Sequence, residues 1–257
     1  MKQKLSPIHI ARRLHQHDLF YFTPHMLRAL FDVERHQSYR LIADMKAEQL
    51  IVEVEKGKYL LLGLEPERVL SNPLFIASQL TTPAYVSYWS ALHFYGFTEQ
   101  APMTTFIATT KKKRPVVFQG MEFRFITILP HKLFGYQRVL AGDLPILIAD
   151  EAKTLIDCLD QPRYAGGFAE VANALRRALP SLDVATLIAY ANQLGDKTLG
   201  SRLGFLLELL GYPAEALIRS ASPVRLIASR AERGAFDSRW RVNANISADE
   251  LFPEGVG

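Results

Sequence analysis

The pattern of apolar and polar positions over the first 63 residues predicts three short helices followed by a β-hairpin. The first helix begins after Ser6, a favourable N-cap residue, and has Pro7 at its first position. Its spacing places Ile8, Ala11 and Leu14 on one face, which predicts that this face is buried.

The second and third helices follow after short polar turns. Thr23 and Pro24 repeat the signals of a helix start, and the apolar side of this second helix carries Met26, Leu27 and Leu30. In the third helix, apolar spacing predicts one buried side, formed by Ser38, Leu41, Ile42 and Met45. The opposite side then carries His36, Arg40, Ala43 and Ala47, with Tyr39 at its edge. Small and hydrogen-bonding side chains there leave room for a partner to approach closely.

A hairpin is predicted directly after the third helix. Alternation typical of strands begins at Leu50, and the chain reverses at Lys56 and Gly57. Lys56 and Lys58 then lie at the tip, while Glu53 and Glu55 are expected to point to solvent, away from any polyanion.

Three helices and a hairpin in this order are typical of a winged helix-turn-helix, in which one side of the last helix enters the major groove of DNA. The expected DNA contacts are Thr23, His25, His36, Gln37, Ser38, Tyr39, Arg40, Lys46, Lys56 and Lys58. Two alternatives stay open. Such modules also bind proteins, and Arg40 could contact either a base or a phosphate.

The stretch GLEPERVLSNPL, which contains Gly63 and two prolines, is expected to separate residues 1–63 from a second domain of residues 64–257. Helices are predicted near 73–80 and 86–95, and strands near 105–108, 116–118 and 123–129. Four longer helices follow, and two late strands are predicted in PVRLIAS and SRWRVNANIS. The predicted fold class is therefore α+β: an N-terminal winged helix-turn-helix followed by a larger, mostly helical domain with a small sheet.

Charge is concentrated in the first quarter of the chain. Residues 1–63 hold ten Lys and Arg against seven Asp and Glu, and five of the seven histidines, whereas the whole chain has a net charge of only +4. This asymmetry favours a polyanionic partner for the first domain. The single cysteine, Cys158, excludes an intrachain disulfide. No signal peptide or membrane-spanning stretch is recognised, so a cytoplasmic protein is expected.

Catalytic chemistry is not evident in the second domain. His93 has no second ligand at metal-binding spacing, and the glycine pair in RYAGGFAEV lacks the spacing of a phosphate-binding loop. We therefore expect no enzyme, cofactor or metal site. The dense basic run of Lys111, Lys112, Lys113 and Arg114 is either a solvated loop or a second patch for phosphates.

Two long segments carry a resemblance to a known family. AYVSYWSALHFYGFTEQ (84–100) and LIADEAKTLIDCLDQPRYAGGFAEVANAL (147–175) resemble the central signatures of the AbiEi-type antitoxins, which are abortive-infection transcriptional regulators of bacteria. KLFGY and SRLGFLLELLG fit the same pattern, so the resemblance extends from the first domain to about Tyr212. The hairpin is more acidic than the family pattern.

The resemblance implies a repressor whose winged helix binds inverted repeats in its own promoter. It also implies a C-terminal domain that neutralises a nucleotidyltransferase-like toxin without forming a stable complex with it. The basic surface implied for that domain would comprise Lys111 to Arg114 with Arg219, Arg225 and Arg230. A ligand-responsive repressor without a toxin remains the alternative, and an enzyme would require a convergent polar site that the sequence does not reveal.

Overall fold

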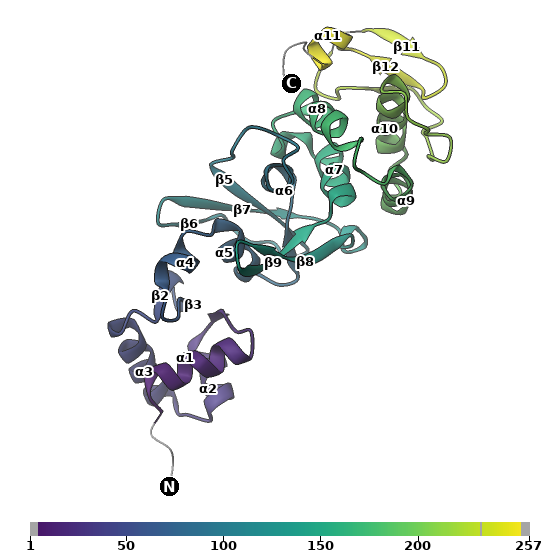
Figure 1. Ribbon diagram of the computed structural model, residues 1–257. Helices are drawn as coiled ribbons and strands as arrows, with labels where there is room; N and C mark the ends of the chain where they lie inside the picture. The colour runs from purple at the N-terminus through teal and green to yellow at the C-terminus, as the bar shows by residue number, and fades with distance from the viewer. Residues whose placement is uncertain (1–4, 232, 253–257) are drawn as a thin grey trace.

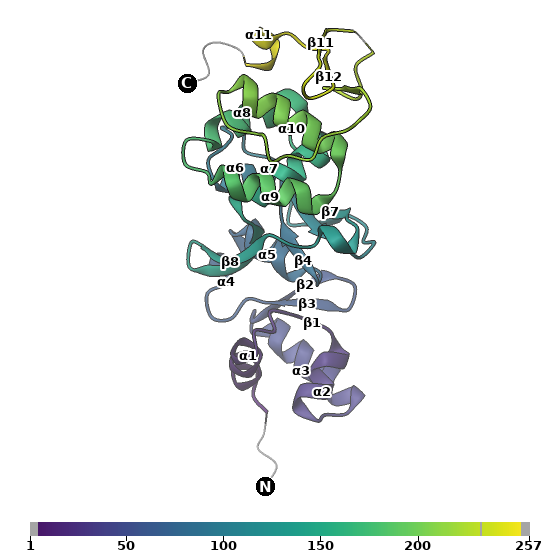
Figure 2. The ribbon, with the colours of Figure 1, turned by 90° about the vertical axis from the view of Figure 1, so that its right-hand side faces the viewer.

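The computed structural model describes residues 5–231 and 233–252 and has a mixed α/β fold. Its elements form an elongated series (Figures 1 and 2). The N-terminal helices lie at one end, a six-stranded sheet lies in the middle, and the later helices with a small C-terminal sheet lie at the other end. In the described ranges, no helix is both long enough and apolar enough to cross a membrane.

The N-terminal end has the elements that the pattern predicts. They are α1 (Pro7–Gln16), β1 (Tyr21–Phe22), α2 (Pro24–Phe31), α3 (Arg35–Ala47), β2 (Ile51–Glu55) and β3 (Lys58–Leu61). Both predicted caps form, since Ser6 accepts a hydrogen bond from the His9 amide and Thr23 accepts one from the Met26 amide, each at 3.3 Å. The strands pair antiparallel in the order β1-β3-β2.

One prediction for α1 is wrong. Ile8 is 49% exposed, whereas Ile10, Ala11 and Leu14 are buried. The buried side of α1 therefore begins at Ile10, two residues later than the pattern suggests. Ile8 is left at the edge of a pocket described below.

The stretch after Gly63 is a packed helix rather than an open linker. It forms α4 (Pro66–Leu70) and runs directly into α5 (Pro73–Gln79), with the Val69 side chain buried. Asn72 caps α5 by accepting a hydrogen bond from the Phe75 amide at 3.0 Å. The two parts of the chain are therefore joined by ordered helical structure.

The central sheet has the strand order β6-β7-β5-β4-β9-β8. Its strands are β4 (Ala84–Val86), β5 (Thr104–Thr109), β6 (Val116–Phe118), β7 (Met121–Thr127), β8 (Tyr136–Ala141) and β9 (Leu144–Ala149). The predicted strands correspond to β5, β6 and β7. β4 pairs antiparallel with β5 and parallel with β9, while β5 and β7 are parallel.

Alternation along the strands buries both faces of this sheet. Tyr85 and Phe106 belong to the core shared with α6 (Tyr88–Phe94) and α7 (Glu151–Asp160). Val86 and Ile107 point to the opposite face, where α5 packs, and belong to the cluster that also contains the N-terminal core residues. Short 3-10 turns at Pro130–Lys132 and Pro162–Tyr164 flank β8 and α7.

The far end contains the predicted helices α8 (Phe168–Ala178), α9 (Val184–Leu194) and α10 (Lys197–Leu209). They are followed by β10 (Val224–Arg225), β11 (Ala235–Asp237), β12 (Val242–Ala244) and α11 (Ala248–Leu251). The two late strands expected from the sequence are β10 and β12, and β11 was not predicted. Gly204 allows α10 to pack against Trp240, because a Cβ atom there would lie 2.2 Å from the indole ring.

The buried residues form two clusters, and one of them crosses the expected domain boundary. The first cluster lies between residues 85 and 251. The second runs from Ile10 through the hairpin to Ile148, so it joins α1–α3 to the sheet. Phe20 packs edge-on against Phe75 of α5, with the ring centroids 5.1 Å apart. Residues 1–63 therefore share a core with the next part of the chain.

Candidate nucleic-acid interface

The α3 helix has one buried side and one open side. Ser38, Ile42 and Met45 are buried against the N-terminal core. On the open side, His36, Arg40, Ala43 and Ala47 are exposed, and Tyr39 is 49% exposed. Two alanines flanked by longer polar side chains form a shallow surface that a nucleic-acid groove could approach.

The first turn of α3 uses two of the predicted contact residues for structure. Gln37 accepts a hydrogen bond from the Glu34 amide at 3.2 Å, as part of a capping box. Ser38 is fully buried, and its hydroxyl donates to the Arg35 carbonyl at 2.8 Å. This corrects the prediction for Ser38, because its place on the apolar side of the helix keeps it from any ligand on the open side.

Three other predicted residues lie at helix starts. Thr23 is occupied as the N-cap of α2, and His25 in the first turn of that helix is exposed. His36 lies 3.7 Å from Glu34, a contact that is an ion pair only when the imidazole is protonated. Arg35 was not predicted, yet its guanidinium lies 6.0 Å from the Tyr39 ring. The Arg-Tyr spacing of four residues is the signal that could have revealed it.

The hairpin carboxylates hold two of the predicted cations. Lys46 pairs with Glu53 at 3.0 Å, and Glu53 also accepts a hydrogen bond from the Gly57 amide at 2.9 Å. Lys58 pairs with Glu55 at 3.3 Å. Within the described ranges, Lys56 makes no ion pair and its side chain is exposed. Lys56 is therefore the cation of the hairpin tip that is most available to a phosphate.

Glu55 does not point away into solvent, which contradicts the prediction made for it. Its carboxylate accepts hydrogen bonds from the Tyr21 hydroxyl and from Lys113 Nζ, the latter at 2.6 Å. Lys113 also donates to the Leu80 carbonyl at 2.8 Å. Glu55 thus bridges the hairpin to the loop between β5 and β6. A partly buried carboxylate needs such hydrogen-bond and charge partners, since burial without them is costly.

The basic run is divided by this bridge. Lys113 is mostly buried and engaged, so it does not contribute to a surface patch. Lys111, Lys112 and Arg114 are exposed. Lys113 contacts Glu55 at the end of β2, so the loop that carries these three side chains is held beside the hairpin tip with Lys56 and Lys58. Cations that are about 55 residues apart in the sequence are thereby brought to one region.

We expect Glu55→Gln to destabilise the chain at neutral pH and to lose this effect in acid. Burial acts to raise the pKa of Glu55, but hydrogen bonds from Lys113 and Tyr21 outweigh it and lower the pKa below 4.5. The stabilisation is thus present above about pH 4.5 and is lost as the pH falls through the lowered folded value. Urea unfolding of the parent chain and of Glu55→Gln, at about pH 7 and about pH 3, measures the difference in the free energy of unfolding. The same difference at both pH values would contradict the stabilising role of the Glu55 carboxylate. Glu48→Gln, at an exposed position, is the control.

A convergent polar cluster that the sequence analysis missed lies in the second part of the chain. Lys153 is fully buried and pairs with Asp157, one turn later on α7. Asp157 accepts hydrogen bonds from Ser87 Oγ at 2.7 Å and from the Tyr85 hydroxyl at 3.1 Å. Lysine and aspartate four residues apart, on the same side of α7 as apolar residues, are the signal that could have revealed it.

This cluster is enclosed in the core. Asp157 is 2% exposed, and burial raises its pKa despite the adjacent ammonium group. Lys153 Nζ lies 4.9 Å from the Phe134 ring and 5.3 Å from the Tyr85 ring. A substrate has no access to groups packed in this way, so the arrangement favours a structural role over catalysis. Among the described residues, no group of three or more histidine, cysteine or acidic side chains could hold a metal ion.

Comparison with known proteins adds no relative to this picture. No protein-family model matches the chain, and no curated protein matches it.

Proposed function

We propose that residues 1–63 form a winged helix-turn-helix that binds duplex DNA and that the chain represses its own promoter. In this proposal α2 and α3 are the helix-turn-helix, α3 is the recognition helix, and β2 and β3 form the wing. Asp32, in the left-handed conformation with φ of 49°, ends α2 and sets the turn between the two helices. The observation that carries the proposal is the open polar side of α3 beside a hairpin whose tip presents Lys56, which forms no ion pair with any residue that the structure describes.

The proposed contact residues differ in whether they would meet bases or phosphates of the DNA. Arg40 and His36 lie on the open side of α3, where side chains can reach base edges in the major groove. Lys56 at the wing tip, with Lys111, Lys112 and Arg114 on the loop beside it, would meet phosphates. The acidic wing strands are already neutralised by Lys46, Lys58 and Lys113. They therefore repel the duplex less than their sequence suggests.

The second part of the proposal is that the chain is an antitoxin of the AbiEi type. The resemblance in segments 84–100 and 147–175 supports it, and these segments supply α6, α7 and α8 with their buried polar cluster. Arg219 and Arg225 are exposed, whereas Arg230 pairs with Glu250 at 2.9 Å. A nucleotidyltransferase-like toxin encoded beside this gene would be the functional partner. The chain would protect the cell from this toxin without forming a stable complex with it.

Salt dependence and base preference test the DNA-binding proposal. The affinity for an inverted repeat upstream of the gene should fall with salt, with a slope of log K against log salt of about −0.9 for each phosphate contacted. Arg40→Ala should cost about 1–3 kcal/mol and relax base preference, whereas Lys56→Ala should weaken all sequences alike. Fluorescence anisotropy with operator and scrambled duplexes measures both. Binding that is indifferent to salt would exclude the proposal.

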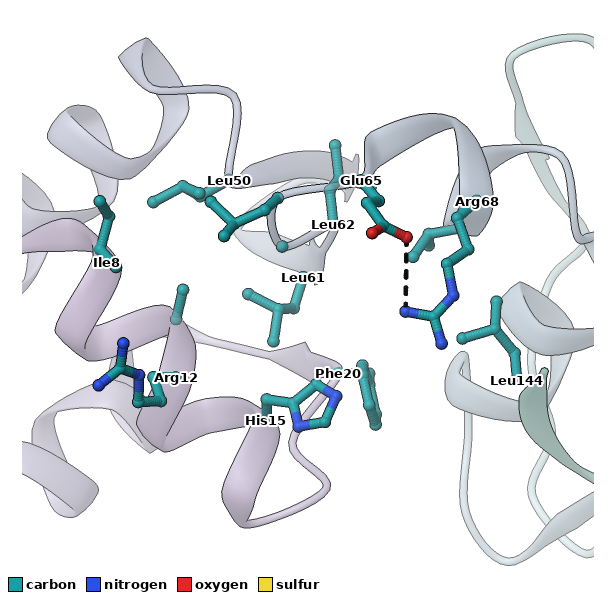
Figure 3. Close-up of a pocket in the computed structure, with 14 residues that line it drawn as sticks. Ile8, Arg12, His15, Phe20, Leu50, Leu61, Leu62, Glu65, Arg68 and Leu144 are labelled. Carbon is teal, nitrogen blue, oxygen red and sulfur yellow. Dashed lines mark ion pairs between the residues drawn. The ribbon is translucent and has the colours of Figure 1, made fainter.

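A ligand-responsive regulator is the second candidate. The observation that favours it is a pocket between the proposed DNA-binding elements and the central sheet, lined by α1 on one side and by α4 and β9 on the other (Figure 3). A ligand held there would touch both parts of the chain. A thermal-shift screen with metabolites tests this candidate independently of DNA.

A further inference from the structure

A pocket of about 270 Å³ lies where residues 1–63 meet the rest of the chain. Figure 3 shows Ile8, Arg12 and His15 of α1 on one side, and Arg68 and Leu144 on the other. Its volume is just below the range of about 300–1,000 Å³ that is typical of small-molecule sites. A ligand with a short apolar chain or a single ring is the size that fits.

The floor and walls of the pocket are apolar. Leu61 and Leu144 are almost fully buried and reach it from the two sides. The Phe20 ring lines it as well and is fixed edge-on by His15, with the ring centroids 5.3 Å apart. Two further lining residues, Ile8 and Leu64, are 49% and 79% exposed. Large exposed apolar side chains that line a pocket indicate a surface that an apolar partner would cover.

Basic side chains outnumber acidic ones among the residues that line the pocket. Arg12 and His15, which are three residues apart on α1, lie on the same side of the helix. Within the described ranges neither forms an ion pair. Arg68 is already held by Asp143 at 2.6 Å and by Glu65 at 3.9 Å. Glu65 is the only carboxylate among the described residues lining the pocket, and it faces Arg68 rather than α1.

We propose that this pocket binds a small amphipathic monoanion. Its apolar body would lie against Phe20, Leu61 and Leu144, and its anionic group would lie against Arg12 and His15. The Arg12 guanidinium, which forms no ion pair within the described ranges, lies beside an imidazole and an apolar wall, and this set complements a carboxylate with a hydrocarbon or aryl body, since the arginine side chain offers a paired hydrogen-bond geometry to a carboxylate. The pocket is lined by residues on both sides of residue 63, so a bound ligand could act on the proposed DNA-binding elements. That sensor role rests on the proposed function, whereas binding of the ligand in the pocket does not.

Isothermal titration of the full chain with octanoate, in the absence of DNA, tests the proposal. We expect saturable binding at one site per chain, and no binding of octylamine, which has the same chain with a cationic head. Arg12→Glu should weaken octanoate binding at least about ten-fold, because it places a like charge beside the carboxylate. Leu64→Asp should weaken it similarly. Both side chains are exposed, so both variants should keep the thermal unfolding midpoint of the parent.

Arg28→Glu is the matched control, because it makes the same change of charge as Arg12→Glu at a residue that is exposed on α2 and does not line the pocket. It should bind octanoate as the parent chain does. Equal binding by the parent, Arg12→Glu and Leu64→Asp would overturn the proposal, as would equal binding of octylamine or the absence of saturable binding. A dimer that dissociates in Leu64→Asp would also overturn it, by showing that a second copy covers the opening. None of these outcomes bears on DNA affinity, which is measured separately.

Discussion

Asp157→Ala should lower the free energy of unfolding by about 3–5 kcal/mol, because it leaves a buried ammonium group without its counter-ion. Lys153 is fully buried, and in the variant its remaining polar partner would be the Tyr85 hydroxyl at 2.9 Å. Ser87 would lose its acceptor at the same time. Urea unfolding followed by circular dichroism measures the change.

The companion variants separate the cost of an unpaired charge from the net value of the pair. Lys153→Met with Asp157→Leu removes both charges and should be much less destabilising than either single change, since buried pairs are costly to desolvate. Glu99→Ala is the exposed comparison. It breaks the pair with Arg177 at 3.2 Å, where Glu99 is 71% exposed, and should change stability by less than about 1 kcal/mol. A double variant as unstable as Asp157→Ala would contradict this account.

Local signals predicted the N-terminal elements well. The caps at Ser6 and Thr23, the buried side of α3 and the reversal at Gly57 each depend on neighbours within a few residues. Such short-range preferences are legible in a single sequence. The open side of α3 could be predicted for the same reason, because helical periodicity alone decides which residues share a face.

The centre of the sheet was not predictable in this way. β4 is a run of three buried residues without alternation, and its pairing with β5 and β9 depends on segments distant in the sequence. Pro145 lies inside β9, where proline argues against a strand. The bridge from Glu55 to Lys113 was missed for the same physical reason. It joins residues 58 apart, and only the packed structure shows that the carboxylate faces inward.

The shared core changes how the proposed division of function should be tested. Removing residues 1–63 would uncover Phe75 and the other apolar residues that share a core with the N-terminal elements, so such a truncation would lose stability along with the proposed DNA binding. A cleaner design keeps the core and changes only exposed side chains. Arg40 and Lys56 are both exposed, on α3 and at the hairpin tip.

Under the proposed DNA-binding mode, Arg40→Glu with Lys56→Glu should lower operator affinity on the order of 10²–10⁴-fold, because two proposed contacts of about 1–3 kcal/mol each would be lost and like charges would face the duplex. Arg163→Glu with Lys197→Glu changes two exposed cations outside residues 1–63, makes the same change in net charge and should bind the operator nearly as the parent does. Equal loss in both variants would show that only net charge matters.

In a host that expresses a cognate toxin, the first variant should lose repression but still restore growth, and toxin and antitoxin should not co-purify. Loss of growth rescue by this folded variant would instead show that protection requires DNA binding, and co-elution as a stoichiometric pair would show direct inhibition.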